Sequence, residues 1–511
     1  MIKTQADELA QQTIFYYNDY GLQIAGKINS LTAFELAQTI EKKYPVDTIT
    51  LSDGTRIWNL LRIYIYSNLP DSLKQKEATG LSFSPFHLLK EGITPLKIPK
   101  IRQPICGFSS GASRKYYKDT FYDIYLDPFY DILGDQLILF EWPEKRGYHR
   151  DYADKLYSKY YVPFHIPLYT SAFWELFFYK LTGHKPFKID HEDILKEIIE
   201  FISATANAEK EKITKDIYDF ITVFFSLKKL FVNILKELSP KAVLIRCGYG
   251  RFPMALAQAC RELHIPSIEL QHGIITTSNV AYIRARTSDN QDCVPEYLLT
   301  YGDIFADMVK KGNLFDKNKI ISVGFPYLER NRDETTKLDD QFKVLCSSFQ
   351  GTILITSQEV IAREIQTFMS EVAEKFTQLG LNIGIIFKPH PFDRTDYSSL
   401  KNHKNVLLID KYEDIYNILK MVDIHATVYS TSGLEAMAFG KPSIFIDIFG
   451  ITNITNSPFI VTTPTQFVET VKYILSKYDE LSQKTLEAAE IFFKSSSEKN
   501  IKKFFTESHL L

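Results

Sequence analysis

The chain has 511 residues, of which 45% are hydrophobic and 24% are charged, and at roughly 150 residues per domain this length allows two to four domains. These globular proportions exclude an intrinsically disordered or fibrous protein. Lysine and arginine together number 60 against 62 acidic residues, a formal charge of −2. We therefore expect no nucleic-acid partner held by bulk charge, and any anionic ligand must be held by local geometry.

The five cysteines are widely spaced, odd in number and form no CxxC pair. This pattern argues against a disulfide framework or a zinc site and fits a reducing cytosol. The first residues lack the apolar core of a signal peptide, and no apolar stretch is long enough to span a bilayer. We therefore expect a cytoplasmic protein.

Aromatic residues are unusually frequent, at 14% of the chain. Most are expected in the core. Others are candidates for a sugar-stacking acceptor surface, or for a patch that lies near the membrane where lipid-linked acceptors reside.

The first 95 residues predict helices joined by loops, with apolar positions at helical spacing in 31–45 and 53–69. From about residue 100, short apolar runs that end in polar or glycine-rich turns predict strands within 103–115, 121–129, 135–145 and 162–170. Long helices follow over 191–238. The second of them is strongly amphipathic, and packing on a core is favoured over a membrane-surface role.

Two alternations of strands and helices come next, over about 241–326 and 351–446, separated by a polar linker at 330–345. Uninterrupted apolar strands between helices indicate parallel sheets covered on both faces. In the second alternation, a helix over 359–380 places its apolar side chains on one face and ends at Gly380.

The predicted organisation is therefore α/β, with two Rossmann-like domains facing across a cleft. A helical N-terminal extension covers 1–95, a first Rossmann-like domain with a helical insertion covers 96–335, a second covers 340–480, and a C-terminal helix covers 481–511. Ligands of open α/β sheets bind at the carboxyl ends of the strands. Polar motifs at those ends are consequently the candidates for function.

The first such motif is Lys388-Pro389-His390-Pro391, directly after a predicted strand. The prolines restrict φ and stiffen the loop. His390 is suited to donate a hydrogen bond to a phosphate or a leaving oxygen, and Lys388 to supply a point charge to the same anion. The alternative is a structural histidine in a proline turn.

The second motif, Ser430-Thr431-Ser432-Gly433, follows a strand and opens a predicted helix. Free N–H groups at a helix start, with hydroxyls and a glycine that allows close approach, are typical of an anion site. Glu435 lies about one turn into the helix and is suited to accept hydrogen bonds from ribose hydroxyls. The alternative is a plain helix N-cap.

The third motif, Gln271-His272-Gly273, places a histidine at a strand end of the first alternation. Gly273 permits an unusual backbone angle or the close approach of a ligand, and the alternative is a turn histidine. Two carboxylates, Glu141 and Asp127, are candidate general bases at other strand ends. Each of them competes with the alternative of a solvated loop charge.

Several motifs are missing from the sequence. It contains no DxD, no HExxH, no Cys/His cluster at metal spacing and no GxSxG elbow. No GxGxxG follows a strand, so a nicotinamide or flavin cofactor is not indicated. We expect neither a bound metal nor a cofactor.

Residues 240–450 resemble the GT-B superfamily of nucleotide-sugar glycosyltransferases, and within it bacterial enzymes of capsule and surface-polysaccharide synthesis. The segments that carry the resemblance are LQHGI, GFPYLE, KPHPFD and STSGLEAMAFGKPSI. The resemblance implies a metal-independent glycosyltransferase with a nucleotide-sugar co-substrate. In this interpretation the second Rossmann-like domain binds the donor and the first binds a glycan or lipid-linked acceptor, in the cytoplasm or at the inner face of the membrane.

Similarity to CMP-sugar sialyltransferases and Kdo transferases implies that His390 faces the donor phosphate and that Ser430, Thr431 and Ser432 hold it. It favours a CMP-linked donor. The chain is similar also to teichoic-acid glycerophosphotransferases, whose His-Gly motif, second histidine and serine pair correspond to His272, His390 and Ser430 with Thr431. This keeps open a CDP-polyol phosphotransferase. Further alternatives are an enzyme like the UDP-GlcNAc 2-epimerases and a nonenzymatic scaffold with a degenerate cleft.

Overall fold

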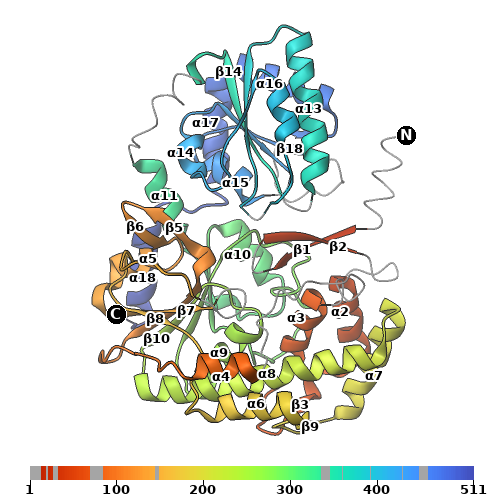
Figure 1. The fold of residues 1–511 in the computed structure, drawn as a ribbon, viewed down its shortest axis with the longest axis vertical. Coiled ribbons are helices and arrows are strands. Elements are labelled where there is room, and N and C mark those ends of the chain that lie inside the picture. The colour runs from red at the N-terminus through yellow and green to blue at the C-terminus, as the bar shows by residue number, and fades with distance from the viewer. Residues whose placement is uncertain are drawn as a thin grey trace. The chain divides into compact units, whose positions relative to one another are not determined.

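The computed structural model describes residues 13–18, 21–26, 33–68, 85–143, 149–334, 346–358, 361–391, 393–428, 430–447 and 459–510. Two compact units make up the chain, and each is described by itself. Unit 1 is built mainly from Leu328–Ser495, and unit 2 from Ala25–Tyr327 together with Ser496–Leu511 (Figure 1). The boundary falls just before the predicted linker at 330–345, most of which lies outside the described residues.

The core of unit 2 is a parallel sheet of seven strands in the order β13-β12-β11-β10-β4-β7-β8. Counted in chain order within this sheet, the strands run 7-6-5-4-1-2-3, which is a doubly wound arrangement with its switch point between β4 and β10. Their bounds are β4 Ile105–Ser110, β7 Leu137–Trp142, β8 Tyr161–Pro163, β10 Ala242–Ile245, β11 Ser267–Leu270, β12 Tyr297–Thr300 and β13 Ile320–Ser322.

The helices of unit 2 cover this sheet. The longest, α8 (Lys210–Leu238), contacts α9 and α6 and buries the aromatic side chains of Phe224 and Phe231. It is therefore a core helix, as the amphipathic pattern favoured. The other helices are α2 Ala33–Lys43, α3 Trp58–Asn68, α4 Pro85–Gly92, α5 Asp127–Leu133, α6 Ser171–Thr182, α7 Glu192–Ala206, α9 Arg251–Glu262, α10 Asp303–Lys310 and α18 Ser497–Glu507.

The chain also contains short two-stranded sheets, of which the first departs from the predicted pattern. Two strands, β1 (Thr13–Asn18) and β2 (Gly21–Gly26), form a sheet in the segment predicted as helices and loops. The others are the pairs β3 (Thr50–Leu51) with β9 (Ile189–Asp190) and β5 (Arg114–Tyr117) with β6 (Thr120–Asp123).

Unit 1 contains a parallel sheet of six strands in the order β16-β15-β14-β17-β18-β19. In chain order this is 3-2-1-4-5-6, the strand order of dinucleotide-binding folds, with the switch point between β14 and β17. The strands are β14 Gly351–Thr356, β15 Ile383–Lys388, β16 Val406–Leu408, β17 Ile424–Thr427, β18 Ser443–Ile446 and β19 Ile460–Val461.

The helices of unit 1 follow the predicted alternation. The apolar face of α13 (Ala362–Gln378) packs with α16 (Pro464–Ser476) on the sheet, and α15 (Thr431–Ala438) contacts α17 (Tyr478–Ala489) (Figure 1). The remaining helices are α11 Pro326–Asp333 and α14 Ile415–Leu419. The strands β14 and β15 are buried along their whole length, as expected for a sheet covered on both faces.

The segment predicted as one C-terminal helix over 481–511 contains parts of two helices. The first, α17, belongs to unit 1, whereas α18 belongs to unit 2, where Ile501, Phe504 and Phe505 pack into the core of the seven-stranded sheet. None of the helices in the described ranges is both long and apolar enough to cross a membrane.

A buried ion cluster joins the first helices of unit 2 to the loop before β12. The Glu41 carboxylate lies 2.6 Å from Nε of Arg62 and 3.9 Å from Nε of Arg284, and it accepts hydrogen bonds from Trp58 and from the backbone N–H of Ala285. Glu41, Arg62 and Arg284 are all at most 3% exposed. Arg284 also forms an ion pair with Asp47 at 3.0 Å, so Glu41 lies between two guanidinium groups and is the carboxylate closest to Arg62.

We expect Glu41→Gln to lower the free energy of unfolding of unit 2 by about 3–5 kcal/mol, because it leaves buried guanidinium groups without this carboxylate. The three tryptophans of the chain, Trp58, Trp142 and Trp174, all lie in unit 2, so urea unfolding followed by tryptophan fluorescence reports on this unit. The control is Glu200→Gln, which removes an exposed ion pair with Lys210 and should cost less than about 1 kcal/mol. Equal losses in the two variants would contradict the role of the cluster.

Candidate active site

The second sequence motif lies at the carboxyl edge of the unit 1 sheet, beside the switch point. Ser430 is the N-cap of α15, as in the alternative to the predicted anion site, and its side chain accepts a hydrogen bond from the backbone N–H of Ser432 at 3.3 Å. Thr431 is the first residue of the helix and is half-buried. The hydroxyl run thus stands where unsatisfied N–H groups at a helix start attract an anion.

The Ser432 hydroxyl points toward the sheet. It lies 2.9 Å from Oγ1 of Thr356, the last residue of β14, and that same hydroxyl lies 3.0 Å from Nε2 of His425 in β17. Neither Thr356 nor His425 was predicted from the sequence, because each occupies an apolar strand and neither belongs to a motif. The sequence feature that could have revealed them is a polar residue within each of two otherwise apolar strands.

Gly433 has a packing role that was not predicted from the sequence. A Cβ atom at this position would lie 2.6 Å from Cζ of Phe445 in β18 and 3.1 Å from Cγ2 of Thr427. The glycine therefore allows α15 to pack closely against the sheet, and its predicted role in the approach of a ligand stays a prediction. Glu435 is half-buried in the same helix.

The loop after β15 carries Lys388 and His390. Lys388 is buried, and its ammonium donates to the backbone carbonyl of Lys411 at 2.6 Å. This bond uses one of the three N–H donors of the ammonium and fixes the position of its charge, so a role of Lys388 as a point charge for a ligand stays a prediction. His390 is half-buried.

A network that the sequence did not reveal fixes the backbone at His390. The hydroxyl of Ser357 accepts from the His390 N–H at 3.3 Å and from the Tyr397 hydroxyl at 3.2 Å, and it donates to the Asp393 carboxylate at 3.3 Å. The N–H of Asp393 in turn donates to the His390 carbonyl at 2.9 Å. The proline-rich loop is thus held by side chains as well as by its restricted φ angles.

In unit 2, the third motif lies at the end of β11. The Gln271 side chain is buried, donating to the Gly273 carbonyl at 2.8 Å and accepting from the Tyr301 N–H at 2.7 Å. Its amide therefore holds the turn rather than facing a ligand. Gly273 is buried and does not adopt a positive φ, so the turn does not require the unusual backbone angle that was considered for it.

His272 follows Gln271 and is held on two sides. Its Nε2 lies 3.2 Å from the hydroxyl of Tyr249, and its backbone carbonyl accepts a hydrogen bond from the Tyr125 hydroxyl at 2.9 Å. Burial and the nearby charge of Arg246 lower the pKa of His272 to about 3. The imidazole is therefore neutral at physiological pH, and it can accept or donate one hydrogen bond at each ring nitrogen according to its tautomer.

The two candidate general bases are both in a buried ion cluster. Glu141 accepts hydrogen bonds from Nε of Arg114 at 2.7 Å, from Tyr152 at 2.8 Å and from Tyr161 at 3.1 Å. Asp127 opens α5 and accepts from Ser158 and from the Asp123 N–H, and it lies 3.7 Å from Arg114. Both carboxylates are at most 1% exposed.

Burial, with the adjacent charge of Asp123, raises the pKa of Asp127 to about 7. The raised pKa follows from the burial of the Asp127 side chain among Asp123, Ser158 and Arg114. The geometry therefore places Glu141 and Asp127 around Arg114 in a buried ion cluster, and a role for either of them as general base stays a prediction.

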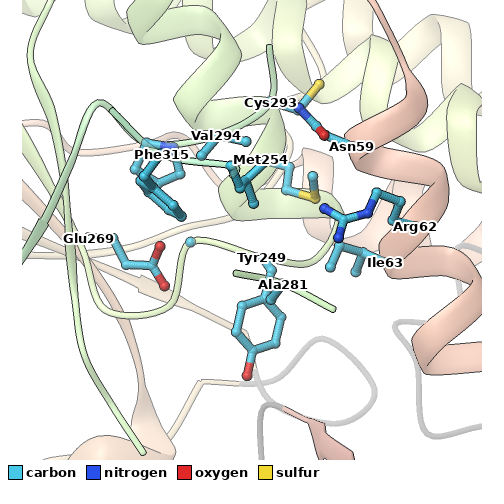
Figure 2. A pocket seen from close by; sticks show the side chains of 13 residues that line it. Asn59, Arg62, Ile63, Tyr249, Met254, Glu269, Ala281, Cys293, Val294 and Phe315 are labelled. Carbon is cyan, nitrogen blue, oxygen red and sulfur yellow. The ribbon is translucent and has the colours of Figure 1, made fainter. Parts of the chain in front are cut away.

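A small pocket in unit 2 is lined by residues of α3, of the loop that carries Tyr249 and of the segment before β12 (Figure 2). Figure 2 shows Glu269 on one side of it and Arg62 on the other. The free space holds about one water molecule, so it cannot take a sugar or a nucleotide. A Cβ at Gly248 would lie 2.2 Å from Oε2 of Glu269, which explains the glycine at this strand end.

Part of this chain is similar to a known enzyme family. Residues 267–503, slightly less than half of it, match the model of a family described as CDP-glycerol:poly(glycerophosphate) glycerophosphotransferase. The matched range contains His272, His390 and the 430–433 run and excludes Asp127 and Glu141. No curated protein matches the chain.

Solved structures of similar fold share little sequence with it. A putative UDP-N-acetylglucosamine 2-epimerase from Listeria monocytogenes is 11% identical with a TM-score of 0.51, covering 80% of this chain and 96% of that one. An MnaA–UDP structure from S. aureus has 12% identity, a TM-score of 0.49 and coverages of 80% and 98%. The wall teichoic acid polymerase TagF has 10% identity, a TM-score of 0.44 and coverages of 80% and 89%.

These findings confirm the predicted GT-B-like α/β fold. Together with the family match, they support a transferase of the GT-B glycosyltransferase and phosphotransferase superfamily. Within that superfamily, the matched family is one of glycerophosphotransferases.

The pocket residue Glu269 gives unit 2 a pH-dependent stability. Burial raises its pKa to about 7 from an ordinary value of 4.5, and Tyr282 donates to it at 2.7 Å. Between these two pH values the folded state holds a proton that the unfolded state has lost. The stabilisation that this proton provides is therefore complete below pH 4.5 and is lost as the pH rises to 7.

The unfolding free energy of the wild type, minus that of Glu269→Gln, should therefore fall by about 3 kcal/mol between pH 4.5 and 7 and stay constant above 7.5. Urea unfolding followed by tryptophan fluorescence measures it. The control, Glu296→Gln, removes a half-exposed ion pair with Lys319 and should shift stability by less than about 1 kcal/mol throughout. Parallel pH profiles for wild type and Glu269→Gln would refute the assignment.

Proposed function

We propose that this chain transfers a polyol phosphate from a CDP-linked alcohol to a growing surface polymer. The observation that carries the proposal is the match of residues 267–503 to a CDP-glycerol glycerophosphotransferase family. That range includes the hydroxyl run and His390 at the carboxyl edge of a doubly wound sheet. The match favours this activity over the transfer of a sugar from a CMP-linked donor, which the motifs alone favoured.

In the proposed reaction, an oxygen of an acceptor hydroxyl forms a bond to the phosphorus of the polyol phosphate. The bond between this phosphorus and the oxygen of CMP breaks, and CMP leaves. Unit 1 would bind the nucleotide phosphates through the N-terminus of α15, Ser430, Thr431 and Ser432, with His390 beside them. Fixed N–H and O–H donors stabilise charge that develops on a leaving phosphate.

His272 is the proposed recipient of the proton from the acceptor hydroxyl. Its imidazole is neutral in the resting protein, so one ring nitrogen has a lone pair. Glu141 and Asp127 have no role in this proposal, because their partners enclose them.

Incubation of the purified protein with CDP-glycerol, a CMP-sugar or UDP-GlcNAc, followed by NMR, separates the candidate activities. Release of CMP with phosphate in the product supports the proposal, release of CMP with sugar in the product supports a glycosyltransferase, and conversion of UDP-GlcNAc to its 2-epimer supports an epimerase. A protein that neither turns over nor binds any of these donors in a thermal-shift assay would be a nonenzymatic scaffold.

We expect His390→Ala and Ser430→Ala to lower kcat/KM at least 100-fold with CDP-glycerol, because each removes a donor to the leaving phosphate. Ser430→Ala should also cost about 1 kcal/mol of stability through loss of the N-cap, so circular dichroism must show that it is folded. The matched controls, His403→Ala and Ser476→Ala, change the same residue types elsewhere in unit 1. Wild-type turnover by both site variants would exclude this site.

We further propose that the acceptor is lipid-linked and that the protein contacts the membrane through an exposed surface on α4, α6 and the residues beside them. This α4–α6 surface consists of Phe86, Ile93, Tyr169, Trp174, Phe178 and Leu181. Phe86 is 85% and Tyr169 73% exposed. A hydrogen bond from the Leu168 N–H to the Gly92 carbonyl joins the segment before α6 to the end of α4, so the α4 part and the α6 part of this surface meet there.

Charge near the α4–α6 surface favours an anionic lipid bilayer as its partner. Residues 85–102 include Lys90, Lys97, Lys100 and Arg102, and their one acidic residue is Glu91, whose pKa burial raises to about 7. Basic residues next to exposed aromatic side chains are typical of segments that lie at a membrane surface.

The triple variant Phe86→Ser, Trp174→Ser, Phe178→Ser should bind phosphatidylglycerol-containing vesicles at least tenfold more weakly than the wild type in co-sedimentation, because it removes apolar area that enters the headgroup region. The control, Tyr412→Ser with Ile491→Ser, removes exposed apolar side chains of unit 1 and should bind as the wild type does. Equal binding by the triple variant and the wild type would refute this surface.

A further inference from the structure

Three polar side chains lie buried in a row beneath the N-terminus of α15. His425 is fully buried, and Thr356 and Ser432 are each 7% exposed. They come from β17, β14 and α15, so the row crosses the switch point of the unit 1 sheet. The distances are 3.0 Å from Nε2 of His425 to Oγ1 of Thr356, and 2.9 Å from that oxygen to Oγ of Ser432.

The environment of His425 determines where its proton resides. Burial lowers the pKa of His425 to about 3, so the ring is neutral and carries a single N–H. Within the described structure its Nδ1 is buried and has no hydrogen-bond partner. A proton on Nδ1 would be a buried donor without an acceptor, which native structures avoid more strongly than a bare lone pair. The N–H is therefore on Nε2 and donates to Thr356.

The direction of the remaining bonds follows from this tautomer. Since Oγ1 of Thr356 accepts from His425, its single proton is free to be donated to Oγ of Ser432. The Ser432 oxygen then accepts, and its own proton must point away from Thr356. Among the described residues, Thr356 is the one hydrogen-bond partner of the Ser432 hydroxyl.

We infer that His425 and Thr356 are positioning residues that orient the Ser432 hydroxyl as an outward hydrogen-bond donor, so that the start of α15 selects an anionic phosphate oxygen of the ligand. This inference rests on the proposed function, because it assumes that the hydroxyl run binds a nucleotide phosphate. It adds the device by which a serine, which can donate or accept, is restricted to donating. The inference also explains why a histidine, His425, occupies a position inside the buried strand β17.

The first experiment compares the binding of CDP with that of cytidine, which lacks the phosphates. Thr356→Val should weaken CDP binding by about 10- to 100-fold, the effect of losing an oriented bond to a charged group, and leave cytidine binding within twofold. Thr427→Val is the matched control, since Thr427 is a buried threonine of β17 whose hydroxyl donates to a backbone carbonyl at 3.0 Å. It should preserve both affinities.

Variants of His425 provide a rescue test. His425→Leu should weaken CDP binding as Thr356→Val does, whereas His425→Gln, whose amide N–H replaces the Nε2 donor, should stay within about threefold of the wild type. Equal loss of CDP and cytidine binding in these variants would indicate a merely structural role and overturn the inference. Unchanged CDP binding in folded Thr356→Val would overturn it as well.

A second measurement does not depend on any ligand. Nitrogen-15 NMR of histidine-labelled protein, with His425→Gln used to assign the signal, reports the tautomer of His425. An Nε2–H ring supports the inferred direction, and an Nδ1–H ring overturns it. Should the wild type bind neither CDP nor CMP, the proposed function fails on that result, while the tautomer still decides the direction of the bonds.

Discussion

In a doubly wound sheet, the chain leaves the first strand in one direction and later returns to continue on the other side of that strand. The two connections at this point pass over opposite faces, so nothing covers the carboxyl ends of the two central strands. The switch point is between β14 and β17 in unit 1 and between β4 and β10 in unit 2. The hydroxyl run follows β17 at the switch point of unit 1, whereas His390 and His272 follow β15 and β11, each one strand away from a switch-point strand.

The fold was largely accessible from the sequence. Continuous apolar strands such as β14 and β15, and the apolar face of α13, are local patterns that tertiary contacts reinforce. The position of the hydroxyl run at a strand end could also be predicted from local sequence. The helix that begins after Ser430 carries its own capping residue.

The roles of individual side chains were less accessible, because they depend on partners distant in sequence. Glu141 resembles a base at a strand end until Arg114 is placed on the neighbouring element. Gly433 resembles a ligand-binding glycine until the ring of Phe445 occupies its space. His425 and Thr356 are 69 residues apart, and no periodicity or spacing brings them together.

Neutral donors accompany the cations among the described polar groups at these strand ends. His272 and His425 are uncharged, and they lie in the same two units as the guanidinium of Arg246 and the ammonium of Lys388. A chain with almost balanced charge can still bind an anion in this way, because N–H and O–H groups fixed by the fold need little reorganisation when the ligand arrives.

The path of the chain has a consequence for its synthesis. Unit 2 is interrupted by Leu328–Ser495, and Ile501, Phe504 and Phe505 complete the core on which β4 and β7 pack. On the ribosome, the interrupting residues emerge before these three side chains. The Leu328–Ser495 part of unit 1 can therefore fold as a continuous segment while unit 2 waits with part of its core exposed.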